Sequence, residues 1–192
     1  MNKPSDKLIR SLWPLPGGNK RYLNTLDRIV KWVASTERPT RDAFNEWLMS
    51  QYNVSENTVN GYFRVVLALG AFEEQSDASL VLAPLGEKVL KAEGEAKARP
   101  VIERFMRDYL AFPEVLTVYA QADGPIHLKE MVETLQPHFP RWTSDAQFEY
   151  RALWLLSLGC LRQVEGRHYE ITQLGKRITA QFSAKVEAKI PP

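Results

Sequence analysis

The spacing of apolar residues between positions 20 and 70 predicts three amphipathic helices. Apolar side chains recur every three or four residues over 23–33, 43–48 and 59–69, so each set falls on one helix face. Thr40 and Ser55 stand just before the second and third stripes, where an N-cap residue belongs. We therefore expect the second and third helices to be joined by a short turn before Ser55.

A change of period after Gly70 predicts a β-hairpin. Glycine tolerates the left-handed geometry that ends many helices, so Gly70 is the expected end of the third helix. Short β-like runs follow at 71–74 and 80–83, and turn-forming residues separate them. Residues 85–90 then predict a closing helix.

The same pattern occurs a second time. Val54 to Ala92 align with Thr143 to Gln181 at a constant offset of 89 positions, without a gap. We therefore expect a second unit that starts with a long helix over about 101–119. Its third helix is expected to begin after Ser144, and its hairpin to turn at Glu165-Gly166.

Composition adds limits rather than a function. A hydrophobic content of 44% and a charged content of 25% are ordinary for a soluble globular protein, and no apolar run suffices to span a bilayer. Cys160 is the only cysteine, which excludes an internal disulfide and fits a reducing, cytoplasmic setting. Residues 1–16 lack the apolar stretch of a signal peptide, so we expect no export.

The net charge of +2 is unevenly distributed. Residues 1–50 carry nine basic and five acidic residues (+4), residues 51–95 three and seven (−4), and the remainder thirteen and eleven (+2). Such asymmetry is compatible with a nucleic-acid contact, but also with an ordinary solvated surface.

The order of elements resembles the winged helix-turn-helix family, over nearly the whole chain in two copies. The resemblance rests on Leu69-Gly70-Ala71-Phe72 with Leu82-Ala83-Pro84-Leu85-Gly86, and on Leu158-Gly159-Cys160-Leu161 with Tyr169-Glu170-Ile171-Thr172-Gln173-Leu174-Gly175. It implies a mainly α fold with small β-hairpin wings (α+β), built as two tandem domains. The expected segments are a basic arm at 1–19, a first domain at 20–95, a second domain at 96–182 and a tail or linker at 183–192.

The resemblance also implies binding of double-stranded DNA, with a third helix in the major groove. Helical geometry places four residues of the first unit opposite the buried stripe: Asn57, Asn60, Gly61 and Arg64. Asn can pair with an adenine edge and Arg with guanine, while Ser55 and Thr58 can hold a phosphate. The alternative is that the asparagines are simply soluble residues near a helix start.

The second unit differs at the equivalent positions, which are Ala146, Glu149, Tyr150 and Leu153. A carboxylate there would repel phosphates. For Tyr150, Leu153 and Trp154 we predict a protein contact or packing against the rest of the chain. Arg151 stands at the border of the buried face, and the pattern leaves its direction open.

The two predicted wings are opposite in charge. The first contains Glu73, Glu74 and Asp77, and the second contains Arg162, Arg167 and His168. We therefore predict a DNA surface that combines the first unit's third helix with the second wing or with the basic arm, which Lys20 and Arg21 directly follow. In the arm, Trp13 and Leu15 are expected to pack on the domain.

Nothing in the sequence indicates catalysis, so we expect a protein that is not an enzyme and that needs no cofactor or metal. His127, His138 and His168 lack metal-ligand spacing, and Gly17-Gly18 lacks the lysine-serine pair of a nucleotide-binding loop.

The sequence thus predicts a cytoplasmic, nucleoid-associated protein that binds double-stranded DNA with some sequence preference. It would act as a regulator or as the recognition module of a restriction or defence system, with the tail leading to a protein partner or fused effector. The alternative is a protein-interaction scaffold, similar to the tandem winged-helix subunits of chromosome-condensation complexes. The oligomeric state is left open.

Overall fold

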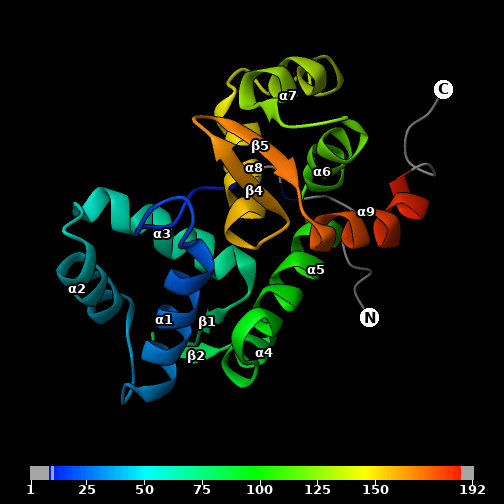
Figure 1. The fold of residues 1–192 in the computed structure, drawn as a ribbon. Helices are drawn as coiled ribbons and strands as arrows, with labels where there is room; N and C mark the ends of the chain where they lie inside the picture. Colours follow the sequence, from blue (N-terminus) through cyan, green and yellow to red (C-terminus); the bar gives the residue numbers. More distant parts are fainter. Residues whose placement is uncertain (1–8, 10, 187–192) are drawn as a thin grey trace. The chain divides into compact units, whose positions relative to one another are not determined.

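A computed structural model describes residue 9 and residues 11–186, the side chains up to residue 182. This part of the chain is mainly α-helical with two small antiparallel sheets, which confirms the predicted α+β class. It divides into two compact units, which within the described residues are 13–101 and 102–186 with 9, 11 and 12; Figure 1 shows their helices and strands. None of the described helices is both long and apolar enough to cross a bilayer.

The first unit contains three helices, a hairpin and a closing helix, in the order that the apolar pattern predicts. Its elements are α1 (Tyr22–Ser35), α2 (Arg41–Tyr52), α3 (Glu56–Leu69), β1 (Phe72–Glu74), β2 (Leu80–Leu82) and α4 (Pro84–Lys91), followed by a 3-10 turn at Gly94–Lys97. The hairpin packs against α1 and α4, and α2 packs against α3.

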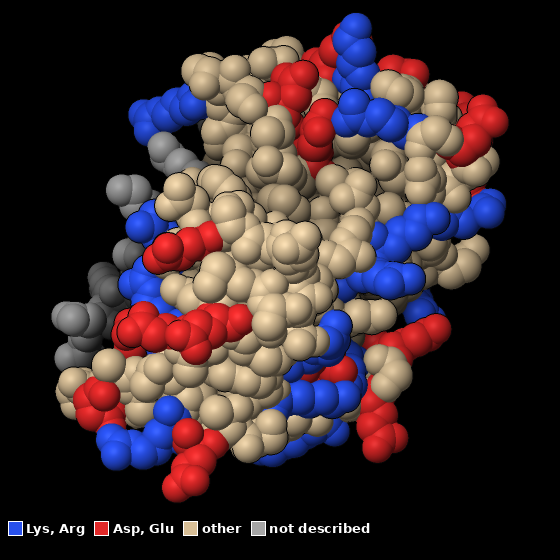
Figure 2. Space-filling model, turned by 90° about the vertical axis from the view of Figure 1, so that its left-hand side faces the viewer, with Lys and Arg blue, Asp and Glu red and all other residues tan. Residues whose placement is uncertain are grey.

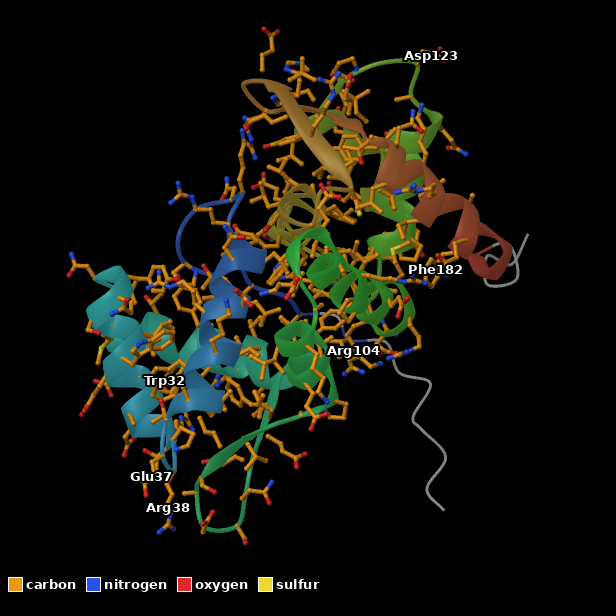
Figure 3. All side chains as sticks on the ribbon, turned by 60° about the horizontal axis from the view of Figure 1, so that its bottom comes forward. Trp32, Glu37, Arg38, Arg104, Asp123 and Phe182 are labelled. Atoms are coloured by element: carbon orange, nitrogen blue, oxygen red, sulfur yellow. The ribbon has the colours of Figure 1, made fainter. Side chains whose placement is uncertain are left out.

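Aromatic rings fill the core of the first unit. Phe44 of α2, Phe63 of α3 and Phe72 of β1 are at most 2% exposed, with ring centroids 5.2–5.6 Å apart. Trp32 of α1 stacks on Trp47 of α2 at 5.1 Å and meets Phe44 edge-on (Figure 3). Aromatic pairs of this kind stabilise a core by more than the area they bury, and the contacts of Phe63 join α3 to α2 and β1.

The ends of these helices test the predicted caps. Thr40 caps α2, because its side chain accepts a hydrogen bond from the Ala43 N–H at 3.3 Å. Ser55 occupies the N-cap position of α3, but its hydroxyl lies 2.9 Å from that of Thr58 and makes no capping bond. Gly70 ends α3 in the left-handed conformation, with φ 76°, as predicted.

The second unit repeats this order with an additional strand. Helix α5 (Ala98–Asp108) leads into it, followed by α6 (Phe112–Gln121), β3 (Ile126–His127), α7 (Leu128–Leu135), a 3-10 turn (Gln136–His138), α8 (Ala146–Ser157), β4 (Leu161–Glu165), β5 (His168–Ile171) and α9 (Gln173–Val186). Strand β5 lies between β3 and β4. In the first unit the pairing of β3 with β5 is replaced by a single β-bridge between Thr40 and Ser79.

One predicted helix is wrong: the stretch 101–119 forms α5 and α6 rather than one helix. Ala111 adopts φ 68°, and Pro113 lies in the first turn of α6, where proline is tolerated. The backbone groups freed at this break are paired by the N-terminal segment. The Ile9 N–H donates to the Asp108 carbonyl at 2.8 Å, and the Ile9 carbonyl accepts from the Leu110 N–H at 3.0 Å.

The backbone contacts around the two hairpins recur at the offset of 89. The Ala71 N–H bonds to the Val66 carbonyl, and the Cys160 N–H bonds in the same way to that of Leu155. A Cβ atom at Gly86 would lie 1.9 Å from the Ala71 carbonyl oxygen. In the second unit, a Cβ atom at Gly175 would lie 2.3 Å from the carbonyl oxygen of Cys160. In both units the closing helix therefore passes against the residue that follows the glycine after the third helix.

Parts of the predicted arm and tail lie outside the described residues, namely 1–8, 10 and 187–192. Helix α9 extends to Val186, four residues into the segment 183–192 that the sequence assigns to a tail.

The close approach at Gly86 leads to a stability prediction. Gly86→Ala would stabilise an ordinary helix by about 1 kcal/mol. Here the added methyl group would clash with backbone, so we expect a loss of about 1–3 kcal/mol in the free energy of unfolding. Urea unfolding followed by tryptophan fluorescence measures it. The control is Gly124→Ala, whose methyl group meets no atom within 4 Å; equal stability of the two variants would contradict the prediction.

Candidate nucleic-acid interface

Helix α3 presents the side chains that the sequence proposes as DNA readers. Asn57 and Arg64 are exposed, while Asn60 and Gly61 are half-buried on the same helix. Val59, Phe63 and Val66 form the buried face and are at most 2% exposed. Within the described residues, Arg64 makes no hydrogen bond or ion pair, so its guanidinium is available to a ligand.

Asn60 is oriented by a residue that pattern analysis missed. Arg41, at the start of α2, donates through Nη2 to the Asn60 Oδ1 at 2.9 Å. The same guanidinium lies 4.8 Å from the centre of the Phe63 ring. This arrangement holds the Asn60 amide in one direction, with its NH₂ group and a second oxygen lone pair still able to bond. The only available signal was that Arg41 starts the helix that packs on α3.

The first turn of α3 is exposed to solvent. Ser55 and Asn57 are exposed and Thr58 is half-buried. Because the Ser55 side chain does not cap the helix, the first N–H groups of α3 have no partner from that hydroxyl. Glu56 adds a negative charge at the same turn, which counteracts the attraction of the helix end for a phosphate.

Lys20 and Arg21 precede α1 and are exposed. Neither forms an ion pair with another described residue. The loop before them is fixed in place, because Thr25 donates through Oγ1 to the Pro16 carbonyl at 2.7 Å. A Cβ atom at Gly17 would lie 3.4 Å from the Tyr52 ring, near the end of α2. This contact brings the loop to the side of the unit where α2 gives way to α3.

The basic residues of the second hairpin are paired with carboxylates. Arg167 donates to Glu149 of α8 at 2.6 Å, and Arg162 forms an ion pair with Glu170 of the neighbouring strand. The His168 ring lies 4.9 Å from that of His127, in edge-to-face contact. Figure 2 shows acidic and basic side chains mixed over the face that it draws. The charge that the sequence assigned to this wing is thus largely compensated.

The first hairpin is acidic, as the sequence indicates. Glu73, Glu74 and Asp77 are exposed. Asp77 forms an ion pair with Arg38 at 3.2 Å, and it bonds to Ser79, which lowers the pKa of its carboxyl group (Figure 3). This end of the first unit does not favour a phosphate backbone.

Of the two roles that the sequence left open for Trp154 on α8, the structure shows packing within the chain. Trp154 is 0% exposed and meets Phe105 edge-on at 5.0 Å, so it packs in the core and cannot form a protein interface. Its place next to the fully buried Leu155 broadens the buried face of α8 beyond a narrow stripe. Tyr150 and Leu153 remain partly exposed.

Arg151 is the residue whose direction the sequence left open, and it points inward. It is 0% exposed and donates to the carbonyl oxygens of Leu110 at 2.5 Å and Gln147 at 2.7 Å. Its guanidinium also lies 4.4 Å from the centre of the Trp142 ring. Burial lowers the pKa of Arg151 to about 9, so the side chain is still charged at neutral pH.

Gln147 connects this buried arginine to the N-terminal segment. Its Oε1 accepts from the Leu12 N–H at 2.9 Å and its Nε2 donates to the Leu12 carbonyl at 3.2 Å. Gln147 occupies the position equivalent to Thr58, 89 residues earlier. The start of α8 is therefore bound to the chain's own backbone, whereas the start of α3 is exposed.

Two further features bear on the chemistry of the chain. No group of three or more His, Cys, Asp or Glu residues is placed to hold a metal ion within the described part. Cys160 is buried, which raises the pKa of its thiol to about 12 and makes it a poor nucleophile.

Comparison with known proteins yields one structural likeness. No protein-family model matches the sequence, and no curated protein matches it significantly. The fold is similar to that of the restriction endonuclease FokI, with a TM-score of 0.53 and 14% identity. The match covers 92% of this chain and 47% of that chain, so this chain spans less than half the length of FokI. At this identity the likeness shows a shared fold.

The buried position of Arg151 leads to a second stability prediction. Arg151→Met removes the guanidinium that donates to the Leu110 carbonyl and to the carbonyl and Oε1 of Gln147, which should cost about 2–3 kcal/mol of unfolding free energy. Urea unfolding measures the loss. The control is Arg177→Met, since Arg177 is an exposed residue of α9 and should change stability by less than about 0.5 kcal/mol. A loss no larger than the control's would show that Arg151 is not needed for stability.

Proposed function

We propose that this chain binds double-stranded DNA and reads it mainly through α3 of the first unit. The observation that carries the proposal is the exposed face of that helix, where Asn57, Asn60 and Arg64 stand together. Asn60 is held in one direction by Arg41, and Arg64 has no partner among the described residues. Asparagine and arginine are the side chains that pair with adenine and guanine edges.

The first unit also supplies cations for the DNA backbone. Lys20 and Arg21 are exposed and form no ion pair with described residues, and Ser55 and Thr58 lie at the start of α3. Phosphate contacts of this kind position a protein on DNA, and contacts to base edges then supply specificity.

The second unit has a smaller part in DNA binding under this proposal. Arg162, Arg167 and His168 are the contacts expected from the sequence, but a phosphate would have to displace Glu170 and Glu149 from the two arginines. Exchanging one anion for another yields little net energy. Tyr150 and Leu153, partly exposed on α8, are then free to meet a protein partner or a fused effector domain.

As to its setting, we propose that the chain is a recognition module, either of a restriction or defence system or of a transcriptional regulator, and that it has no catalytic role itself. The fold shared with the restriction endonuclease FokI supports the first of these, because it covers 92% of this chain. A module of this type would associate with the nucleoid.

The first test is binding to random-sequence duplex DNA, followed by fluorescence anisotropy at 50 and 200 mM salt. Each phosphate that the protein neutralises should add about 0.9 to the slope of log affinity against log salt concentration. We expect tight binding at low salt and a slope that corresponds to several phosphates. Absence of binding at low salt would contradict the proposal.

The second test concerns Arg64. On a duplex selected from a random pool, Arg64→Ala should weaken binding by about 1–3 kcal/mol, the contribution of one arginine paired with guanine. Arg38→Ala is the matched control, because it removes the same charge from the same unit beside the acidic hairpin. Similar affinities for the two variants would remove α3 from the reading surface.

A protein-interaction scaffold is the alternative that the charge pattern favours. The first hairpin is acidic, and the arginines of the second are already paired with carboxylates. A scaffold would show no salt-dependent affinity for duplex DNA, so the same titration separates the two functions.

A further inference from the structure

Trp13 lies on the reading helix of the first unit. Two atoms of its indole ring, Cε3 and Cζ3, would be 3.4 Å from a Cβ atom built at Gly61. Trp13 is 49% exposed, although tryptophan is usually well buried. The ring therefore covers the backbone of α3 on the face that carries Asn57, Asn60 and Arg64.

Gly61 explains how the ring reaches this position. Glycine inside a helix costs about 1 kcal/mol relative to alanine, so its place in the middle of α3 needs a reason. A Cβ atom at residue 61 would be in ordinary van der Waals contact with the indole, and without a longer side chain there the ring lies directly on the helix. The ring of Trp13 thus covers the helix surface at residue 61.

The segment that carries Trp13 is anchored. Leu15 is 3% exposed in the core, and the Pro16 carbonyl accepts the hydrogen bond from Thr25. Pro14 and Pro16 restrict the backbone on either side of Leu15. A ring held this way loses little conformational freedom when it meets a ligand.

The chemistry of the major groove gives such a ring a specific use. The groove displays hydrogen-bond donors and acceptors, and its apolar feature is the methyl group at C5 of thymine. The neighbouring side chains Asn57, Asn60 and Arg64 are polar or charged, so they suit the hydrogen-bond donors and acceptors of the groove. We propose that Trp13 contacts the 5-methyl group of a pyrimidine, next to the base edges that Asn60 and Arg64 read; this rests on the proposed function.

Two kinds of base present this methyl group, thymine and 5-methylcytosine. The experiment starts from a site selected out of a random duplex pool made with thymine, and from a second pool made with 5-methylcytosine in place of cytosine. In each selected duplex, single thymines are replaced by deoxyuridine, or single 5-methylcytosines by cytosine. Either change removes the methyl group and leaves the hydrogen-bonding edge intact, and anisotropy then measures affinity.

For the unaltered protein we expect a loss of about fourfold at one position, the contribution of one buried methyl group. The position identifies which pyrimidine is recognised. Trp13→Ala should bind the methylated duplex about fourfold more weakly than the unaltered protein does. At that position its affinity should no longer depend on the methyl group, whereas the affinity of Trp13→Leu should still depend on it in part. The control is Val164→Ala, since Val164 is 47% exposed on the second hairpin and should leave the difference unchanged.

The outcomes separate this inference from the function on which it rests. If the protein binds DNA with the expected salt dependence but Trp13→Ala keeps the methyl difference, or no position shows one, the inference is wrong and the function stands. Tighter binding by Trp13→Ala to every duplex would mean that the ring blocks α3, which also overturns it. Absence of DNA binding by the unaltered protein overturns both. Circular dichroism and thermal unfolding of each variant verify that it is folded.

Discussion

Both units depend on one close approach between a glycine and a carbonyl group. In the first, the Ala71 carbonyl accepts from the Ala83 N–H at 3.2 Å, and Gly86 lies so near that only a hydrogen atom fits. In the second, the Cys160 carbonyl accepts from the Thr172 N–H at 3.0 Å beside Gly175. Since this contact joins the closing helix to the residue that follows the glycine after the third helix, it sets the direction in which the hairpin leaves that helix.

The shared backbone contacts leave the surfaces of the two units free to differ. A contact between main-chain atoms does not restrict which side chains stand at exposed positions, so two units with the same backbone contacts can have different surfaces. On α3 the first turn is exposed and Arg64 has no described partner. On α8 the equivalent turn holds the Leu12 backbone through Gln147, and Glu149 is occupied by Arg167. One helix is therefore accessible to a partner, while the other is occupied by its own chain.

The sequence predicted most of the local structure, because caps, periods and glycine ends are properties of neighbouring residues. It failed at Phe112-Pro113, where the apolar stripe continued and outweighed the signal of the proline, which restricts the residue before it. It left Trp154 open between a protein contact and packing within the chain, because a helix packed on several neighbours buries a wider face than a simple stripe suggests.

The candidate site was only partly predictable. Helical geometry alone predicts which residues share the exposed face of α3, and the structure places Asn57, Asn60, Gly61 and Arg64 on the side opposite the buried stripe. Other contacts decide whether a predicted site residue is oriented, paired or covered, and these join residues on different elements. They are Arg41 with Asn60, Arg167 with Glu149, and Trp13 with Gly61. A pattern read within one element contains no information on such pairs, since their distance is set by packing.

The pairing of the N-terminal segment has a consequence for how the chain is made. Leu12 bonds to Gln147, which follows it by 135 residues, and Ile9 pairs with the backbone at 108–110. Chains emerge from the ribosome at about 5–20 residues per second, and domains generally fold as units in that order. The residues of the first unit are all synthesised before Gln147, so that unit can fold during translation. Leu12 then remains without Gln147 for about 7–27 s at these rates, so the segment around Leu12 is among the last parts of the described chain to reach its native partners.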